Sequence, residues 1–451
     1  MKFNDEVVMQ EIGGIPLVGN LANGYVIGLT GEGAEACRRM LREDVPADEI
    51  AAIDGNLLQH LTQGGFFKRA EGAASESGCD GVGRTTHAPE SSAHNASSET
   101  PASGPAPLRG PVLSAYLHVT QRCNLACRGC YSLDEHRNAL DDAPLADVCR
   151  AIDQLAAVGL QRLVISGGEP FLRDDLPDIV RHAKEDCGVP RVDVLSNGTR
   201  ITAEALEEMA PYVDGVSVSF DGCSADSVPY IRREQRFDEL VAAVRMVQDA
   251  GIAAHIIPTA HAKNIHELPK YVALARELGA TMNFSLLTCE PGDPDLGGLL
   301  PDDEVLRELG RNMLTMGDGA PVLAVDSPIG MNLTVKRDCG AGMRTISVDA
   351  DGTVYPCHMM HRPQLAMGNA FTGSLSDALA GEVGETMRSL TVEDCEGCNE
   401  CRYEYICGGG CRARSLYATG SLRQPDSYCA MICEFYDTLG THMAANLGAQ
   451  K

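Results

Sequence analysis

The chain has no tryptophan, and aromatic residues make up only 5% of its 451 positions. It also lacks any run of about 18 apolar residues, the length that a helix needs to cross a bilayer, so we expect no membrane partner. Basic residues are scarce, because 37 Lys and Arg stand against 63 Asp and Glu and give a net charge of −26. This deficit argues against a general grip on nucleic-acid phosphates, and we expect no nucleic-acid partner.

The first residues, from Met1 to Glu6, lack the basic region and apolar stretch of a secretory signal. We therefore predict a cytoplasmic protein. Thiols stay reduced in that compartment, so 18 cysteines indicate metal or redox chemistry rather than disulfides. At roughly 150 residues per domain, the length predicts about three domains.

Composition divides the chain into four segments. We predict a small α+β, winged-helix-like domain over 1–68, a flexible linker over 69–110, an α/β barrel domain over 111–320 and a cysteine-rich domain over 321–451. The linker prediction rests on a stretch rich in Ala, Ser, Gly, Glu, Thr and Pro with almost nothing large and apolar to bury. Its Cys79, His87 and His94 lack the spacing of a metal site.

The barrel segment alternates short apolar strands with amphipathic helical stretches. Strands are expected near 113–119, 162–166, 191–196, 215–220, 252–258 and 281–287, and helices within 143–158, 173–186, 203–210, 236–250 and 265–278. About six βα units predict a parallel sheet in a partial (β/α)6 barrel. In such folds the chemistry lies in the loops at the carboxyl ends of the strands.

Directly after the first of these strands, Cys123, Cys127 and Cys130 form a C-x3-C-x2-C motif. Three thiolates on one loop can hold a four-iron cluster and leave one iron open, whereas a structural zinc site would need a distant fourth ligand. The next strand ends in Ser-Gly-Gly-Glu-Pro over 166–170. There the glycines let the backbone approach a ligand, and Glu169 can accept a hydrogen bond from an ammonium group.

Together these two motifs resemble those of the radical S-adenosylmethionine (SAM) superfamily. The resemblance implies a 4Fe-4S cluster on the three cysteines, reductive cleavage of SAM and a 5′-deoxyadenosyl radical. It also implies cofactor contacts from three loops: Gly167, Gly168, Glu169, Pro170, Ser196, Asn197, Ser219 and Asp221. The alternative for the Ser, Asn and Asp positions is turn formation and strand capping. Gly129 stands where the family usually has an aromatic residue, and Tyr131 follows the third cysteine instead.

Nine further cysteines crowd into the C-terminal segment, where G-x4-C is followed by C-x2-C-x5-C-x3-C and a later cysteine. This spacing resembles the SPASM domain, which implies two auxiliary clusters. The implied ligands are Cys398, Cys401, Cys407 and Cys429 for the distal cluster, and Cys339, Cys357 and Cys411 for the one nearer the active site. The near cluster then has an open iron or takes Cys395 or Cys433, which are otherwise free thiols.

Five cysteines stand singly among apolar elements, where a free thiol is usually a small buried hydrophobe. They are Cys37, Cys149, Cys187, Cys223 and Cys289.

The N-terminal segment resembles the PqqD-like family, which binds leader peptides. The resemblance rests on 21–29 leading into Gly31–Ala34, on helical patterns that begin at Thr30 and cover 47–54 and 55–63, and on the closing Gly-Phe-Phe of 65–67. It implies that an exposed strand edge beside the first long helix receives an extended peptide. A regulatory or purely structural cap is the alternative.

The combined resemblance implies a peptide maturase that abstracts hydrogen from a ribosomally made precursor peptide and installs a thioether or carbon–carbon crosslink. Its partners would be that peptide, with its leader, and an electron donor such as flavodoxin or ferredoxin. Two alternatives are an enzyme of the sulfatase-maturating type that oxidises a protein Cys or Ser, and a non-catalytic peptide-binding scaffold.

Overall fold

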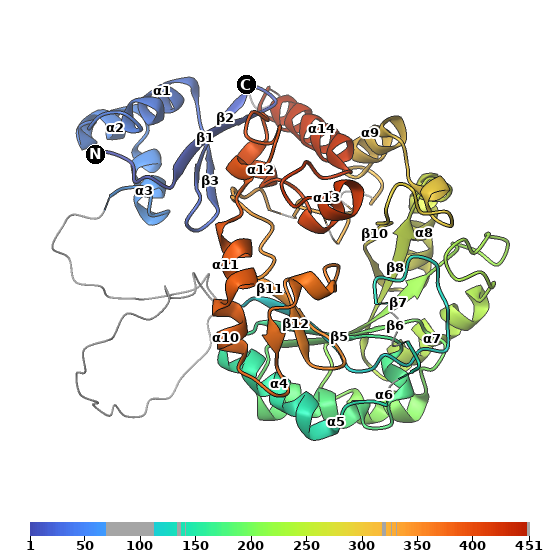
Figure 1. Cartoon of the computed structure of the whole chain (residues 1–451). Coiled ribbons are helices and arrows are strands. Elements are labelled where there is room, and N and C mark those ends of the chain that lie inside the picture. The colour runs from blue at the N-terminus through green and yellow to red at the C-terminus, as the bar shows by residue number, and fades with distance from the viewer. Residues whose placement is uncertain are drawn as a thin grey trace, which may run out of the picture.

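A computed structural model describes residues 1–68, 112–132, 137–139, 141–317, 322–325, 327–330 and 332–448 (Figure 1). The predicted linker, with Cys79, His87 and His94, lies outside these residues. Within them, no helix is long and apolar enough to cross a membrane.

The N-terminal unit is an antiparallel sheet of three strands beside three helices. The strands are β1 Val7–Ile12, β2 Ile15–Asn20 and β3 Tyr25–Gly28, in the order β1-β2-β3. The helices are α1 Gly31–Met40, α2 Ala47–Ile53 and α3 Gly55–Gln63, each within a residue of its predicted bounds. Thr30 caps α1, because its hydroxyl accepts a hydrogen bond from the Gly33 amide.

The barrel segment contains a parallel sheet covered by helices on its outer face (Figure 1). Its strands are β4 Ser114–His118, β5 Arg162–Ser166, β6 Arg191–Ser196, β7 Gly215–Phe220, β8 Ala253–Ala260, β9 Thr281–Met282 and β10 Ser285–Leu286. Its helices are α4 Leu145–Ala157, α5 Leu176–Arg181, α6 Ala203–Met209, α7 Phe237–Asp249, α8 Leu268–Glu277 and α9 Asp303–Asn312. The predicted α/β architecture with a parallel sheet is thus confirmed.

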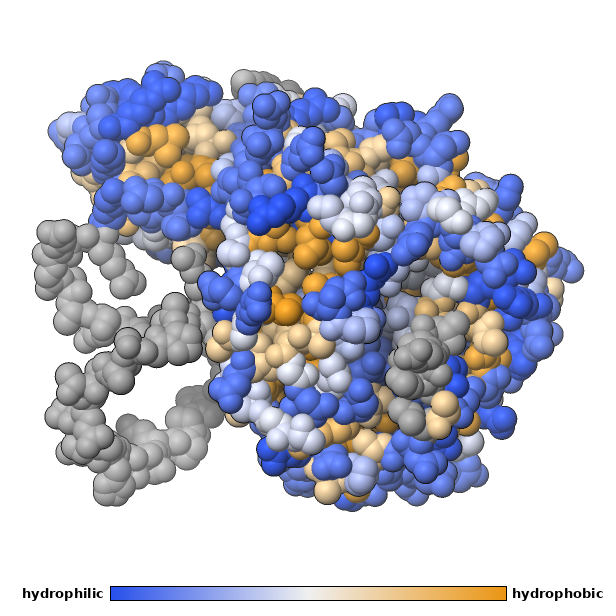
Figure 2. Space-filling model, viewed as in Figure 1, coloured by the Kyte–Doolittle hydropathy of each residue, from blue (hydrophilic) through white to orange (hydrophobic). Residues whose placement is uncertain are grey.

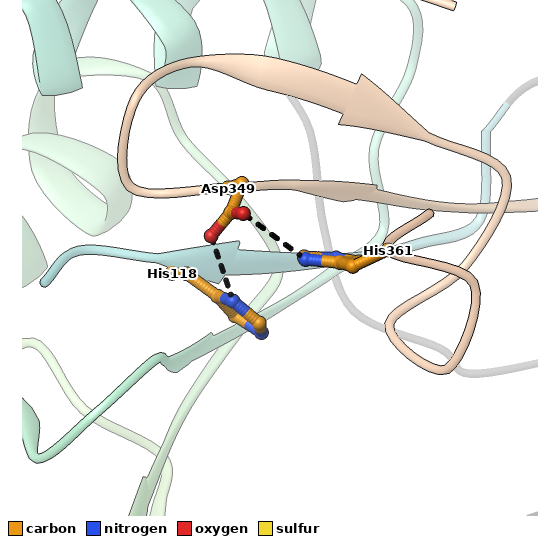
Figure 3. A group of neighbouring side chains, drawn as sticks. All are labelled: His118, Asp349 and His361. Carbon is orange, nitrogen blue, oxygen red and sulfur yellow. Dashed lines mark hydrogen bonds and ion pairs between the residues drawn. The ribbon is translucent and has the colours of Figure 1, made fainter. Parts of the chain in front are cut away.

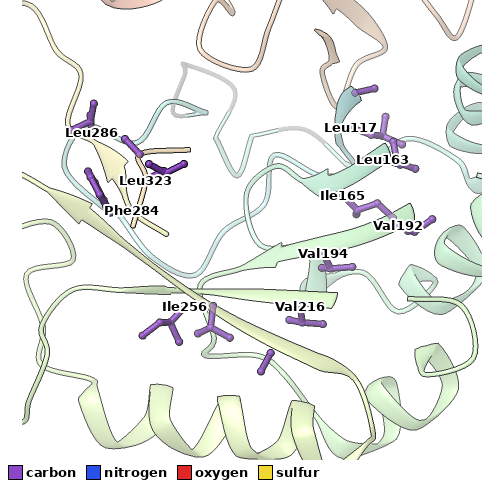
Figure 4. Close-up of a cluster of buried hydrophobic side chains, with 14 of the residues drawn as sticks. Leu117, Leu163, Ile165, Val192, Val194, Val216, Ile256, Phe284, Leu286 and Leu323 are labelled. Atoms are coloured by element: carbon purple, nitrogen blue, oxygen red, sulfur yellow. The ribbon is translucent and has the colours of Figure 1, made fainter. Parts of the chain in front are cut away.

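Side chains along each strand alternate between the two faces of the sheet. This alternation decides which side chains join the hydrophobic core and which line the inner face. Leu117 of β4 and Ile165 of β5 are fully buried in the main hydrophobic core, together with Val194 of β6 (Figure 4). Because side chains on a strand point to opposite faces in turn, Tyr116 and His118 lie on the other face of β4, away from this layer. The inner face therefore carries polar and aromatic groups that are available for chemistry.

The cysteine-rich segment continues the barrel sheet. Strand β11 Thr345–Val348 pairs in parallel with β4, and β12 Thr353–Tyr355 and β13 Gly368–Asn369 extend the sheet in antiparallel fashion. These strands are only two to four residues long, too short for an apolar period to be visible in the sequence. The pairing places the segment after β12 directly beside the end of β4.

The C-terminal helices pack against both other domains. They are α10 Leu375–Ala380, α11 Glu382–Ser389, α12 Glu404–Cys407, α13 Arg412–Thr419 and α14 Cys429–Gly448. Helix α14 packs against α9, where a Cβ on Gly310 would lie 2.5 Å from the carbonyl oxygen of Met431. It also contacts β1, and Ile12 and Leu17 of the N-terminal sheet join the main core. The N-terminal unit is therefore docked on the C-terminal helices.

The single cysteines are not all buried. Cys37 and Cys289 are buried, as expected, and Cys149, Cys187 and Cys223 are half-buried, with Cys187 and Cys223 packed against the main core. The expectation of buried thiols therefore holds for the first two and only in part for the other three.

Candidate active site

The loop after β4 carries Cys123, Cys127 and Cys130. The Cys123 amide donates a hydrogen bond to Asn138 Oδ1 at 2.8 Å. Side-chain nitrogens face two of the thiols, with Asn197 Nδ2 3.8 Å from Cys123 Sγ and Arg137 Nη2 3.7 Å from Cys130 Sγ. Such donors stabilise thiolate ligands.

The three thiols are close enough to affect one another electrostatically. Burial, with smaller contributions from the neighbouring Cys130 and Cys123, raises the pKa of the Cys127 thiol to about 11, although the Arg232 charge lowers it. Without a bound metal this thiol is therefore neutral at pH 7. Three soft sulfur donors on one loop fit an iron–sulfur cluster, and cluster binding would release their protons.

Two glycines bring the loop after β5 against the cysteine loop. Gly167 has a φ of +125°, and a Cβ on Gly168 would overlap the carbonyl oxygen of Arg122. The Gly168 amide donates to Thr120 O at 2.7 Å, and the Glu169 amide donates to Arg122 O at 2.8 Å. Only glycine allows this approach.

The Glu169 side chain is fully buried, and protein groups occupy both of its oxygens. Oε1 accepts from Ser196 Oγ at 2.8 Å, and Oε2 accepts from the Asn197 amide at 2.7 Å. Burial raises the pKa of this carboxyl. In this geometry Glu169 joins the loops after β5 and β6.

A buried arginine that no sequence motif indicated joins the remaining predicted residues. Asp221 Oδ2 accepts from the amides of Ile231 and Arg232, both at 2.7 Å. Arg232 Nη1 donates to Asn197 O at 3.1 Å, and its charge acts on Cys127. Ser219 is half-buried at the end of β7, two residues before Asp221.

The inner face of the sheet holds a second polar group that the sequence did not reveal (Figure 3). His118 Nδ1 lies 3.2 Å from Asp349 Oδ1, and His361 Nδ1 lies 3.3 Å from Asp349 Oδ2. Gln121 Nε2 also donates to Asp349, at 2.9 Å. Although burial opposes it, the two imidazoles hold the pKa of Asp349 well below its usual range.

Aromatic contacts connect the first cysteine loop to the segment after β12. The Tyr131 hydroxyl lies 2.8 Å from Ser166 Oγ, and its ring meets His358 edge-on with a centroid separation of 5.3 Å. His358 in turn stacks on Tyr116 at 4.0 Å. Because Tyr131 follows Cys130 and His358 follows Cys357, this contact links two cysteine-bearing loops.

The C-terminal thiols form two groups. Cys339, Cys357 and Cys411 line one cavity of about 340 Å³. Cys433 lies 4.0 Å from Cys429 and interacts with Cys401, while Cys407 interacts with Cys398 and Cys401. Cys395 instead accepts a hydrogen bond from Arg412 Nη1 at 2.9 Å. Cys433 thus lies with the predicted distal set, away from the near one.

A buried ion pair holds the two groups together. Arg414 donates to both oxygens of Asp426, at 2.8 and 2.7 Å, and neither side chain is more than 2% exposed. Asp426 also accepts from the amides of Cys411 and Tyr428, at 2.7 and 2.9 Å. It therefore fixes one near-group cysteine and the residue before Cys429.

Comparison with known proteins matches two family models. One is described as the radical SAM superfamily and matches residues 117–275, and the other is described as an iron-sulfur cluster-binding domain, SPASM, and matches 339–402. The chain is 31% identical over 345 residues to the mycofactocin maturase MftC of Mycolicibacterium smegmatis, which covers 71% of this chain and 83% of that protein.

Other relatives have different named activities. The AdoMet-dependent heme synthase of Methanosarcina barkeri is 29% identical, with 71% of this chain and 96% of that protein covered. The PqqA peptide cyclase of Gluconobacter oxydans is 26% identical, with 72% and 92% covered.

Two solved structures share the fold at low identity. Native anSMEcpe with bound AdoMet and Cp18Cys peptide has a TM-score of 0.59 at 15% identity and covers 75% of this chain and 99% of its own. Streptococcus suis SuiB bound to precursor peptide SuiA has a TM-score of 0.56 at 14% identity and covers 95% and 99%.

The predicted cofactors agree with these matches, since both families bind 4Fe-4S clusters and structural neighbours bind SAM. On this chain the thiols of the first cysteine loop can bind a cluster, and Gly167 and Gly168 bring the neighbouring loop against it. The chain is therefore an enzyme that belongs to the radical SAM superfamily and carries a SPASM domain.

Proposed function

We propose that this enzyme modifies a ribosomally made precursor peptide and recognises its leader through residues 1–68. The observation that carries the proposal is the extent of the structural likeness. The SuiB likeness covers 95% of the chain and so extends into the N-terminal unit, whereas 75% is covered for anSMEcpe. Relatives named as a maturase and a peptide cyclase add support.

Bound SAM and its cluster supply a carbon-centred oxidant, and the residues of this chain orient it. We assign Cys123, Cys127 and Cys130 to the cluster. We assign the backbone of 167–170 and the side chains of Ser196, Asn197, Ser219 and Asp221 to the SAM pocket. Glu169 acts as a positioning residue through Ser196 and the Asn197 amide. The enzyme is proposed to act in the cytoplasm, where an electron donor such as flavodoxin or ferredoxin reduces its cluster.

The leader is proposed to add a strand to β3. Among the described residues β3 pairs only with β2, while the opposite edge strand, β1, packs against α12 and α14. Figure 2 shows apolar side chains gathered on this unit between α1 and α3. Ile27 of β3 and Leu58 of α3 are partly exposed members of its core. An open edge beside apolar side chains suits β-augmentation.

Leu58→Glu is expected to weaken leader binding by about 10- to 100-fold, the effect of losing roughly 1.5–3 kcal/mol of apolar burial. The measurement is fluorescence anisotropy with labelled synthetic candidate leader peptides, chosen as those that bind the wild-type protein. Gln59→Glu adds the same charge at an exposed neighbouring position and should bind normally. Equal affinity for wild type and Leu58→Glu would place the leader elsewhere.

Gly168→Ala tests the SAM pocket. Its Cβ would overlap the Arg122 carbonyl, so the loop before Cys123 must shift. Misplacement of about 1 Å can cost 10²-fold in rate, and we expect a loss of this order in 5′-deoxyadenosine formation with the iron content retained. Gly292→Ala, where a Cβ meets nothing within 4 Å, is the matched control. Unchanged activity would exclude this loop from the pocket.

The product is proposed to be a thioether or carbon–carbon crosslink. The near thiols Cys339, Cys357 and Cys411 line one cavity, and Cys395 lines another with Cys339. The Cys395 thiol is occupied by a hydrogen bond from Arg412, which supports a near cluster with three cysteine ligands. An open position there would suit a peptide thiolate and hence a thioether. Tandem mass spectrometry of peptide co-expressed with the enzyme distinguishes the products, because a bond between two carbons leaves every cysteine of the peptide free for alkylation.

A further inference from the structure

A second group of metal-ligating side chains lies on the outer surface of the barrel, outside the predicted cluster-binding loops. Asp153 belongs to α4, and His182 and Cys187 lie at the end of the neighbouring helix α5. Helices α4 and α5 lie side by side on the outside of the sheet (Figure 1). Cys187 and His182 are half-buried between them, and Asp153 is exposed.

The three donor atoms converge on one point. His182 Nε2 lies 2.9 Å from Asp153 Oδ1, Cys187 Sγ lies 3.2 Å from the same oxygen, and Cys187 Sγ lies 3.4 Å from His182 Nε2. Zinc bonds of about 2.0 Å to nitrogen or oxygen and 2.3 Å to sulfur place tetrahedral ligands about 3.3–3.7 Å apart. The observed triangle is within a few tenths of an ångström of that size.

The backbone is shaped to bring His182 and Cys187 together. Helix α5 ends at Arg181 and continues as a π-helical turn over His182–Asp186, where the Cys187 amide donates to His182 O at 3.0 Å. In an α-helix, residues five apart point in different directions, whereas the wider π turn places them one above the other. Such turns are frequent at functional sites.

The other nitrogen of His182 has the partner that a zinc-bound imidazole usually has. His182 Nδ1 lies 2.9 Å from Asp186 Oδ2. A carboxylate on Nδ1 holds the proton there and leaves the Nε2 lone pair directed at Asp153 and Cys187. This pairing of carboxylate, histidine and metal orients the ligand.

Among the described residues, the basic side chains next to this group pair with other carboxylates. In the described part of the chain neither Asp153 nor Asp186 pairs with Lys or Arg, because Lys184 bonds to Asp214 and Arg181 to Asp178. Cys149 lies one helical turn before Asp153 on α4, and its thiol interacts electrostatically with Cys187. It is a candidate for a fourth ligand, with water as the alternative.

We propose that Asp153, His182 and Cys187 bind one Zn²⁺ ion, with Cys149 or water in the fourth position and Asp186 orienting His182. The ion would join α4 to α5, the helices on either side of β5 in the chain. β5 is followed directly by Gly167 and Gly168, which contact the cysteine loop. By joining α4 to α5, the ion would therefore stabilise the strand and helices against which this loop lies. The proposal is independent of the substrate.

Zinc retention in the full-length protein with its clusters tests this. Protein stripped of loosely bound metal is equilibrated with Zn²⁺ and a competing chelator, and zinc and iron are measured by mass spectrometry. Wild type should retain one zinc ion more than His182→Ala or Cys187→Ser, at equal iron content. Asp186→Asn should weaken zinc affinity by about 10- to 100-fold. Cys37→Ala, which removes a thiol elsewhere, should retain the zinc.

X-ray absorption at the zinc edge keeps the proposal testable if a variant folds poorly. The wild-type spectrum should show one sulfur, or two if Cys149 binds, with nitrogen and oxygen completing four ligands, and Cys149→Ser should remove one sulfur only in the second case. Zinc retained equally by wild type, His182→Ala and Cys187→Ser would overturn the proposal. A spectrum with four sulfur ligands would also overturn it, since it would locate the zinc in the iron-cluster cysteines.

Discussion

Replacing Cys123, Cys127 and Cys130 together by Ala is expected to remove about four iron atoms per chain and to abolish 5′-deoxyadenosine formation. The reason is geometric, because these three thiols share one loop and Cys123 and Cys130 lie close enough to act electrostatically on Cys127. Without their thiolates the loop holds no cluster to reduce SAM. The measurement is iron and sulfide per chain, with 5′-deoxyadenosine quantified under a strong reductant in the absence of oxygen.

The matched control removes thiols that lie outside all three cysteine groups. A Cys37→Ala, Cys289→Ala variant should keep about twelve iron atoms per chain on a model with three four-iron clusters. The idea fails if the three-cysteine variant still forms 5′-deoxyadenosine, or if reconstituted wild type holds zinc in place of iron in these loops. Peptide modification that survives the change would exclude the radical mechanism.

The parts of the site that the sequence predicted are those encoded locally. Cys123, Cys127 and Cys130 span eight residues, and the Ser-Gly-Gly-Glu-Pro motif directly follows a strand with an unbroken apolar run. The bounds of β4 to β7 differ from the predictions by at most one residue, because alternating apolar strands and amphipathic helices give a strong periodic signal. The roles of the two motifs came from resemblance, since spacing alone also allowed a zinc site.

The unpredicted parts depend on contacts between distant residues. His118 and Asp349 are 231 positions apart and meet only because β11 pairs with β4. Arg232 lies in a polar loop, and only the fold shows that its charge faces Cys127. Helix α14 includes glycines and β-branched residues that weaken its intrinsic helical propensity, and packing on α9 supports it. None of these features is predicted by a pattern of neighbouring residues in the sequence.

Asp426→Ala is expected to destabilise the C-terminal domain by about 3–5 kcal/mol, because it removes one partner of a buried, doubly hydrogen-bonded ion pair. Arg414 is 0% exposed, so water cannot replace the carboxylate. The change also removes the acceptor for the Cys411 amide, which positions a thiol of the near group. We expect a lowered melting temperature and the loss of up to about eight iron atoms per chain, while the four on the first cysteine loop remain.

The control is an Asp–Arg ion pair that is exposed to solvent. Asp303 and Arg307 pair at 3.4 Å on the exposed face of α9, and Asp303→Ala should change stability by less than about 1 kcal/mol. An Asp426→Ala protein that melts and binds iron like wild type would show that the buried pair does not hold the auxiliary sites.

A double replacement separates the effect of the buried charges from the loss of the hydrogen bond that Asp426 accepts from the Cys411 amide. Arg414→Met with Asp426→Leu removes both buried charges, and exchanges of this kind often restore or exceed the original stability. It does not restore the acceptor for the Cys411 amide. If the double variant regains the melting temperature but not the iron, Asp426 acts mainly by positioning Cys411. If it regains both, the cost of Asp426→Ala lies in the loss of the carboxylate from the buried Arg414 guanidinium, and the cysteine loop keeps its shape through its own packing.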